Sequence, residues 1–421
     1  MREMKDSGVK WIGVIPDDWQ VNNPKYHFTQ RKDRAPQGMV QLTASQKHGV
    51  ITQTEYMERT GANIVTVQKD FDILKLVCAG DFVIHMRSFQ GGLEYSEKTG
   101  SISSAYVMLI PGETICEPRY YKWFFKSSNY IDALSSTSNL VRDGQAMRWA
   151  NFIQLPITFP PAAEQKRIAD FLDAKCAEID ALAADIQTQI DTLEQYKRSV
   201  ITVTVTKGLN PNAEMKDSGV FYMAPMNATW RLTKIGYICS KLSRSFAPED
   251  TALICSNKGK VQVRADDLTG IMVSDDNAMQ GIHAGDIAIH GMDTWHGAIA
   301  LSEYDGKITR VVHVCDSTED KRFIVYYMQH LAFQGVYKLI SNGVRGNTSD
   351  FRSWDKVRDI WIAIPETKEE QAAICDYLDR QCTAVEEVIA TKKEQLEVLG
   401  EYKKSLIFEY VTGKKEVPCN D

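Results

Sequence analysis

The chain has 421 residues, of which 43% are hydrophobic and 25% are charged, and its formal net charge is −6. This length suggests about two to four domains, and the composition predicts a soluble globular protein, because no apolar run approaches the roughly 18 residues that a membrane span needs. The start of the chain is polar, and the nine scattered cysteines form no C-x-x-C pair, which argues against a signal peptide and a structural zinc site and predicts a reduced, cytoplasmic protein.

The sequence contains two copies of one unit. The hexapeptide MKDSGV at residues 4–9, followed by Trp19, recurs at residues 215–220, followed by Trp230, with an offset of 211 residues in both places (from 4 to 215 and from 19 to 230). Six identical residues in a row are hard to attribute to chance. The offset far exceeds the roughly 20–50 residues of a solenoid repeat, so we predict a pseudo-two-fold duplication of a domain pair.

Residues 1–155 are predicted to form the first variable domain, which includes the repeat segment 1–19. Its residues 20–155 contain 15 Lys+Arg against 12 Asp+Glu, so this block is mildly basic although the whole chain is acidic. Gly80-Asp81 precedes alternating apolar residues, a pattern that predicts a turn leading into a half-buried strand. The same pattern follows Gly285-Asp286, so we expect both variable domains to share one mixed α/β fold.

Residues 156–209 are predicted to form a long spacer helix. No glycine or proline interrupts residues 164–205, while prolines precede this segment and Gly208 follows it. Apolar residues recur in it every seven positions, with further ones three positions later, which predicts a coiled-coil seam. The residues expected in this seam are Ile179, Leu182, Ile186, Leu193 and Tyr196.

The same order then repeats. Residues 210–360 are predicted to form the second variable domain, with the repeat segment 215–230, and residues 361–421 the second spacer helix. This helix repeats the pattern of the first at an offset of 206 residues, as from Glu164-Gln165 to Glu370-Gln371. Its expected seam residues are Val385, Val388, Leu399 and Tyr402.

Each spacer helix of about 40 residues would be roughly 60 Å long, and an apolar seam of that length needs a partner. We therefore predict an α+β protein in which two α/β domains are separated by two long antiparallel spacer helices that form a coiled-coil pair. The alternative is that each helix packs on its own domain.

No catalytic constellation is present in the sequence. It has neither a phosphate-binding loop nor an H-E-x-x-H motif, and Asn23-Pro24-Lys25-Tyr26 lacks the second proline of a methyltransferase tetrapeptide, so it is interpreted as a loop. His85 and His290 occupy equivalent strand positions. We expect a shared packing or hydrogen-bonding role for them, with DNA contact or a metal site as alternatives. No catalytic or metal-binding residue is predicted.

Taken together, these features resemble the specificity (S) subunit of type I restriction–modification systems. The resemblance covers essentially the whole chain and its variable–repeat–variable–repeat order. It rests on the two openings that run to Trp19 and Trp230, on the Gly-Asp strands, and on residues 160–173 (PPAAEQKRIADFLD) with their second copy. The second opening departs from the first, because residues 221–225 (FYMAP) lack an equivalent of Trp11-Ile12-Gly13.

The resemblance implies that each variable block is a target-recognition domain for three to five base pairs of double-stranded DNA. The two blocks differ, so the target would be asymmetric and bipartite, and the helices would set the gap. Two methyltransferase (M) subunits and the motor–nuclease (R) subunits would bind the chain. S-adenosylmethionine, ATP and Mg²⁺ would bind those partners, and no cofactor would bind this chain, which is expected to be non-catalytic.

Polar and basic loop residues are the candidates for DNA contact, because base edges and phosphates are read by such side chains. The alternative for each is a solvated surface turn. In the first domain they are Arg31, Lys32, Arg34, Ser45, Gln46, Lys47, His48, Arg87, Ser88, Gln90, Arg142 and Gln145. In the second domain they are Asn257, Lys258, Lys260, Thr294, Trp295, His296, Arg345 and Asn347.

Two other functions fit the same residues. One is the specificity subunit of a type II-like system, in which a single fused partner chain both methylates and cleaves. The other is a coiled-coil adaptor whose globular domains bind protein.

Overall fold

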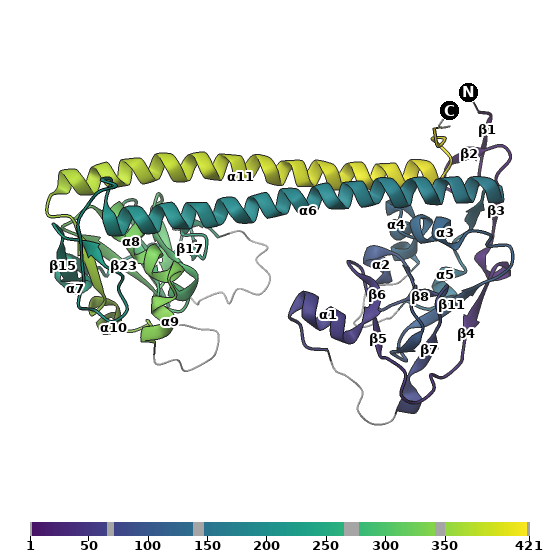
Figure 1. The fold of residues 1–421 in the computed structure, drawn as a ribbon, viewed down its shortest axis with the longest axis horizontal. Coiled ribbons are helices and arrows are strands. Elements are labelled where there is room, and N and C mark those ends of the chain that lie inside the picture. Colours follow the sequence, from purple (N-terminus) through teal and green to yellow (C-terminus); the bar gives the residue numbers. More distant parts are fainter. Residues whose placement is uncertain (1, 65–70, 138–146, 265–277, 342–349, 419–421) are drawn as a thin grey trace. The chain divides into compact units, whose positions relative to one another are not determined.

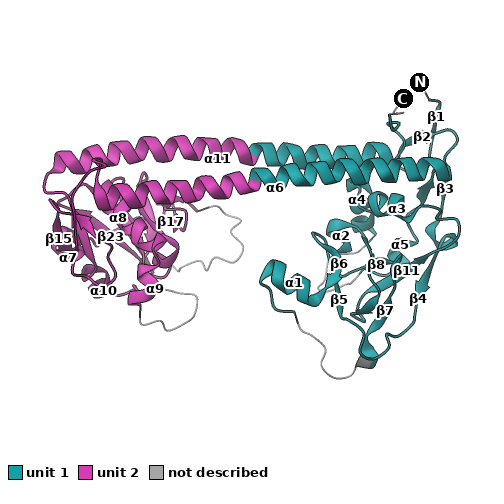
Figure 2. Ribbon diagram, in the orientation of Figure 1, with its two compact units in different colours: residues 1–186, 394–421 teal, residues 187–393 magenta. Residues whose placement is uncertain are grey.

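A computed structural model describes residues 2–64, 71–137, 147–264, 278–341 and 350–418 (Figure 1). The chain divides into two compact units, one made of residues 1–186 and 394–421 and the other of residues 187–393 (Figure 2). This division falls within two long helices, α6 (Ala162–Lys207) and α11 (Lys368–Val411). Each unit therefore contains one mixed domain and a part of both helices. Within the described residues, no helix combines the length and the hydropathy that crossing a bilayer requires.

The domain of the first unit is built around a four-stranded antiparallel sheet in the order β4-β11-β8-β9, whose strands are Phe28–Arg31, Val107–Pro111, Phe82–Ile84 and Glu94–Tyr95. Four strand pairs surround it: β1 (Met4–Asp6) with β2 (Val14–Pro16), β3 (Gln20–Asn22) with β12 (Ile157–Phe159), β5 (Leu42–Ser45) with β6 (Gly49–Thr52), and β7 (Lys75–Val77) with β10 (Gly100–Ile102). The short helices are α1 (Gln53–Thr60), α2 (Ser88–Gly91), α3 (Pro118–Phe124), α4 (Ser128–Ser136) and α5 (Trp149–Phe152).

The second unit repeats this topology. Its four-stranded sheet has the order β16-β23-β20-β21, whose strands are Cys239–Lys241, Val312–Ser317, Ile287–His290 and Ile299–Leu301. Its strand pairs are β13 (Met215–Lys216) with β14 (Met226–Asn227), β15 (Arg231–Lys234) with β24 (Trp361–Ile364), β17 (Leu253–Ser256) with β18 (Lys260–Val263), and β19 (Met279–Ile282) with β22 (Gly306–Thr309). The helices are α7 (Ile235–Ile238), α8 (Lys321–Phe333), α9 (Val336–Ile340) and α10 (Trp354–Arg358). The predicted α+β fold with a duplicated domain and two long helices is confirmed.

Each unit has a main core that joins its domain to the helices. In the first unit, the aromatic residues Phe28, Phe82 and Phe124 belong to the same buried cluster as Ile168 of α6 and Ile407 of α11. A corresponding cluster in the second unit joins α8 and the sheet to the adjacent segments of α6 and α11. The helices therefore pack on the domains as well as on each other, so the two alternatives raised by the sequence are not exclusive.

Within each unit, α6 and α11 lie side by side and run antiparallel, because the residue number in one helix falls as that of its contact in the other rises. The cross-helix contacts in the first unit are Phe171–Tyr410 and Asp180–Lys403, and those in the second unit are Gln189–Lys392 and Lys197–Glu386.

One part of the seam prediction is wrong. Leu182, Tyr196, Val388 and Tyr402 are 50%, 50%, 46% and 56% exposed, whereas Ile179, Ile186 and Val385 are buried as expected. Leu193 and Leu399 are half-buried.

The second buried stripe lies four residues after the first, not three. Ile190 follows Ile186 and is 2% exposed, and Ile389 follows Val385 and is 8% exposed. A seven-residue recurrence is compatible with a second apolar stripe either three or four residues after the first, because both spacings repeat within one heptad. Leu182, Tyr196 and Tyr402 are apolar or aromatic and lie three residues after the first stripe, so they indicated a three-residue spacing. In the folded protein the buried residues follow the four-residue spacing instead.

Candidate nucleic-acid interface

The repeated motifs hold each domain on the helices. The Trp19 indole N–H donates to the carboxylate of Glu164 at 2.9 Å, and the Trp230 indole N–H donates to that of Glu370 at 3.0 Å. Each glutamate lies in the first turn of its spacer helix, where a carboxylate is favoured by the helix dipole. The opening and the Glu-Gln motif therefore recur together because their side chains form one contact.

A second duplicated contact accounts for the Gly-Asp strands. Arg31 forms two hydrogen bonds to Asp81, at 2.7 and 2.9 Å, and Arg244 forms two to Asp286, at 3.0 and 3.1 Å. Both carboxylates are buried, and the hydrogen bond to Asp81 raises the pKa of Arg31. The prediction that Arg31 contacts DNA is corrected, because its guanidinium is used by the scaffold.

The equivalent histidines also have a shared structural role. The Nδ1 atom of His85 accepts from the Arg87 backbone N–H at 3.2 Å, and that of His290 accepts from the Asp293 N–H at 3.1 Å. Burial lowers the pKa of His290. Both imidazoles thus fix the turn that follows their strand. Among the described residues, no group of three or more His, Cys, Asp or Glu side chains is placed to hold a metal ion.

Two further DNA candidates are buried. Ser88 is fully buried, and its hydroxyl accepts from the His85 backbone N–H at 2.9 Å. Thr294 is 1% exposed at the start of a 3-10 helix (Thr294–His296). Neither side chain can reach a base in this conformation, so both predictions are corrected. Trp295 is half-buried and packs on the core of the second unit.

Exposed candidates of the first domain gather where the β5–β6 turn meets α2. Gln46, Lys47, Arg87 and Gln90 are exposed, and the Gln46 amide donates to the Arg87 carbonyl at 3.3 Å. A Cβ added at Gly91 would lie 2.4 Å from the Gln46 amide nitrogen, so the turn and the helix are closely packed. This set of four side chains, the first reading surface, combines donors for base edges with charges for phosphates.

The other candidates of this domain are more dispersed. Lys32 is exposed, and Arg34 donates to the Ile73 carbonyl at 2.7 Å. Ser45 and His48 are half-buried. Arg142 and Gln145 of this domain, and Arg345 and Asn347 of the second domain, lie outside the described residues.

The equivalent turn of the second domain, between β17 and β18, carries exposed Asn257, Lys258 and Lys260. Lys260 forms an ion pair with Glu386 of α11 at 2.7 Å. His296 is also exposed, with Asp293 3.9 Å from its ring nitrogen. This turn lies beside the helices and faces Lys197, Arg198 and Lys393 across a cleft, a contact that the local sequence does not indicate. From the sequence, the surfaces of the spacer helices are expected to pack or to bind the methyltransferase subunits, and no DNA contact is predicted for them.

Comparison with known proteins shows which proteins this chain is similar to. No family model matches the chain. A predicted type I restriction enzyme MjaX specificity subunit of Methanocaldococcus jannaschii is 20% identical over 438 residues, which cover 96% of each protein. The StySPI type I specificity subunit of Salmonella potsdam is 31% identical over 97 residues, or 22% of this chain and 20% of that protein. A chain of a solved type I restriction–modification structure superposes with a TM-score of 0.64 at 13% identity, covering 95% of this chain and 99% of that one.

The chain is a relative of the type I specificity subunits. The match extends over nearly the full length of the archaeal specificity subunit, so both variable domains and both helices have counterparts in it. The resemblance predicted from the repeated motifs is thereby confirmed. The superposition with the solved chain shows that the two chains share one fold.

Proposed function

We propose that this chain is the DNA-specificity subunit of a type I restriction–modification complex. The observation that carries the proposal is the duplicated scaffold with diverged turns. The Arg–Asp and Trp–Glu contacts recur in both units, while the β5–β6 turn (SQKHG) and the β17–β18 turn (SNKGK) differ. Two different reading surfaces on one scaffold suit a target with two different halves.

Each domain would read one half of an asymmetric site in double-stranded DNA, and the paired helices would set the gap. In the first domain, Gln46 and Arg87 are suited to base edges and Lys47 to phosphate. The chain as a whole carries a net charge of −6, so its own cations are too few to hold DNA tightly. A more basic partner would supply the remaining phosphate neutralisation.

The proposed partners are two methyltransferase subunits, joined by motor–nuclease subunits. An exposed apolar pair occurs once in each unit, Leu182 with Tyr402 and Tyr196 with Val388, at positions related by the 206-residue offset. The Asp180–Lys403 ion pair places Leu182 and Tyr402 at a similar level along the two helices. Because the same surface recurs, we assign it to two copies of one partner. S-adenosylmethionine, ATP and Mg²⁺ would bind the partner subunits.

The test is methylation mapping. The chain is co-expressed with its neighbouring methyltransferase in a host without DNA methylation, and modified adenines are located across the genome. The expected result is a split, asymmetric motif with a fixed gap. Replacing residues 20–155 with the corresponding segment of a different specificity subunit should change one half of the motif only.

Two outcomes would contradict the proposal. A soluble complex that modifies no adenine would favour the adaptor function. A single partner chain that both methylates and cleaves would place the protein in the type II-like alternative. The matched control is the same exchange applied to residues 231–360, which should change the other half.

A further inference from the structure

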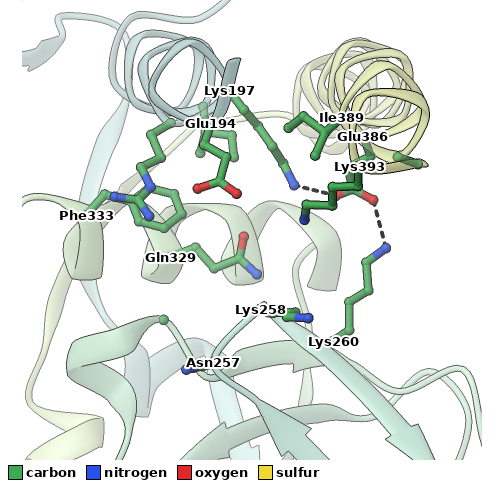
Figure 3. A pocket seen from close by; sticks show the side chains of 15 residues that line it. Glu194, Lys197, Asn257, Lys258, Lys260, Gln329, Phe333, Glu386, Ile389 and Lys393 are labelled. Atoms are coloured by element: carbon green, nitrogen blue, oxygen red, sulfur yellow. Dashed lines mark hydrogen bonds and ion pairs between the residues drawn. The ribbon is translucent and has the colours of Figure 1, made fainter. Parts of the chain in front are cut away.

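The second unit contains a cleft of about 410 Å³ between the β17–β18 turn, α8 and the adjoining segments of α6 and α11 (Figure 3). Gln329 of α8 and the turn residues Asn257 and Lys258 line it from below in the view of Figure 3, and Lys197 and Lys393 line it from the helices. All of the lining residues belong to one compact unit, residues 187–393. The cleft is therefore a feature of the second recognition domain together with its part of the spacer.

Positive charge predominates in this cleft. Its lining includes five cations and two carboxylates, which are Lys197, Arg198, Lys258, Lys260, Lys393, Glu194 and Glu386. Glu386 accepts ion pairs from two of the lysines, Lys197 and Lys260. Its carboxylate therefore joins the turn to both helices and does not neutralise the remaining cations.

Three of the five cations in the cleft are not paired with Glu386, which binds the other two. Among the described residues, no carboxylate lies within ion-pair distance of Arg198, Lys258 or Lys393. The Arg198 guanidinium lies over the Phe333 ring, 5.4 Å from its centroid, which keeps it at the rim of the cleft. Cations from three separate segments thus converge on one concave surface, an arrangement suited to an anion.

The floor of the cleft is fixed by short-range contacts. The Gln329 amide donates to the Ile299 carbonyl at 2.7 Å. Gly259 has φ +71°, and a Cβ added there would lie 2.5 Å from the Gln329 amide nitrogen. The turn can approach α8 this closely because position 259 is a glycine.

The first unit does not repeat the whole arrangement. Its β5–β6 turn has the same length, but Gly49 stands where the second unit has Lys260. Asp180, the equivalent of Glu386, pairs with Lys403 at 2.6 Å. The ion pair between turn and helix is thus specific to the second unit within the described residues.

We propose that this cleft binds a backbone phosphate of the DNA, with Lys258 of the turn and Arg198 and Lys393 of the spacer helices as its ligands. The inference rests on the proposed function and extends it, because it gives the spacer helices a role in DNA affinity. A phosphate contact carries no base information, so the cleft strengthens binding to every sequence alike. Free polyphosphate has the same chemistry and is the competing source of the anion.

The test measures DNA affinity of the complex with its methyltransferase at several salt concentrations, using a duplex with the mapped motif and one without it. In the variant R198Q/K258Q/K393Q, the slope of log Kobs against log salt should become shallower by about 0.9, as for one lost phosphate contact. Affinity for both duplexes should fall by the same factor, about five- to tenfold at 0.1 M salt. The mapped motif should stay unchanged.

The matched control is K166Q/R167Q/K368Q, which removes three exposed cations at the starts of α6 and α11. It should leave the slope as in the wild type. Lys258→Gln alone, at an exposed turn position, repeats the test without changing either helix and should lower affinity for both duplexes in the same direction. Equal melting temperatures would show that folding is intact.

An unchanged slope in the triple variant would overturn the proposal, as would a loss confined to the specific duplex. Saturable binding of inorganic tripolyphosphate that the triple variant abolishes, with the DNA slope unchanged, would assign the cleft to free polyphosphate instead. If the wild-type complex itself does not distinguish the two duplexes, the proposed function fails, and that result is separate from the effect of the variant.

Discussion

The Trp19 indole N–H donates to Glu164 at 2.9 Å, at the place where α6 begins. The same indole ring meets the end of the other helix, because a Cβ at Gly413 would lie 3.0 Å from it. Trp230 repeats both contacts, with Glu370 at the start of α11 and Gly208 just after the end of α6. Each tryptophan thus holds one helix start and one helix end beside its own domain.

Replacing Trp19 by Phe should destabilise the protein by about 1.5–3 kcal/mol, because a charge-assisted hydrogen bond is lost and Glu164 is 8% exposed. Urea unfolding measures the change. Trp11→Phe is the control, since within the described residues the Trp11 indole N–H has no hydrogen-bond partner. Equal losses in both variants would assign the effect to ring packing alone.

The corrected seam predicts a contrast between two apolar residues of α6, Ile190 and Leu182. Ile190→Ala should cost about 2–4 kcal/mol, because the side chain is 2% exposed and its removal leaves a cavity. Leu182→Ala, at a side chain that is 50% exposed, should cost less than about 1 kcal/mol. Thermal or urea unfolding measures the loss of stability in both variants. A larger loss for Leu182→Ala than for Ile190→Ala would support the three-residue spacing instead.

The repeated apolar pairs predict separable docking sites. Tyr196→Ser and Tyr402→Ser should each release one methyltransferase subunit, and together both, with little change in stability because these rings are 50% and 56% exposed. The mass of the purified complex measures the stoichiometry. Phe221→Ser, at an apolar residue that is 81% exposed and not on the helices, serves as the control. Full occupancy in the double variant would rule these pairs out as docking sites.

Lengthening both helices should lengthen the gap in the DNA target. Seven residues inserted after position 186 and seven after position 393 preserve the heptad seam and add about 10 Å, which corresponds to about three base pairs. Methylation mapping should show both half-sites unchanged with the longer gap. Insertion into α6 alone breaks the antiparallel register and should instead lower stability. An unchanged gap in the stable double insertion would mean that the helices do not measure the spacing.

His330 predicts a pH dependence of stability. Burial lowers the pKa of this histidine to about 4, whereas an unfolded histidine titrates near 6.5. The unfolded state therefore binds the proton first, so stability is full above about pH 6.5 and is lost as the pH falls toward 4, by up to about 1.4 kcal/mol per pH unit. His330→Gln should remove this contribution from the unfolding free energy measured against pH.

Thr202→Val tests whether the pH dependence comes from burial of the imidazole or from its hydrogen bond. The variant removes the 3.1 Å hydrogen bond to His330 but keeps the imidazole buried. It should retain the slope. A slope that persists unchanged in His330→Gln would assign it to other groups, such as His290 and His313, whose pKa values burial also lowers.

Part of the candidate site could be predicted from local sequence. Gln46, Lys47 and Lys258 were found because polar residues beside glycine, flanked by apolar strands, indicate exposed turns, and all three side chains are exposed. Arg31, Ser88 and Thr294 also lie in polar segments next to strands, but Arg31 pairs with Asp81 and the other two side chains are buried. The partner of Arg31 is distant in sequence, and Ser88 and Thr294 are buried by the fold, so the local pattern could not separate these residues from exposed ones.

The sequence by itself determined the duplication, the α+β class and the two long helices, because repeats, periodicity and helix-breaking residues are local properties of a chain. Tertiary structure alone decided which stripe of each helix is buried and which arginine is held by an aspartate. It also brought Arg198, Lys258 and Lys393 to one cleft. These outcomes depend on contacts between residues far apart in the chain, whose geometry is fixed only when helices and domain pack together.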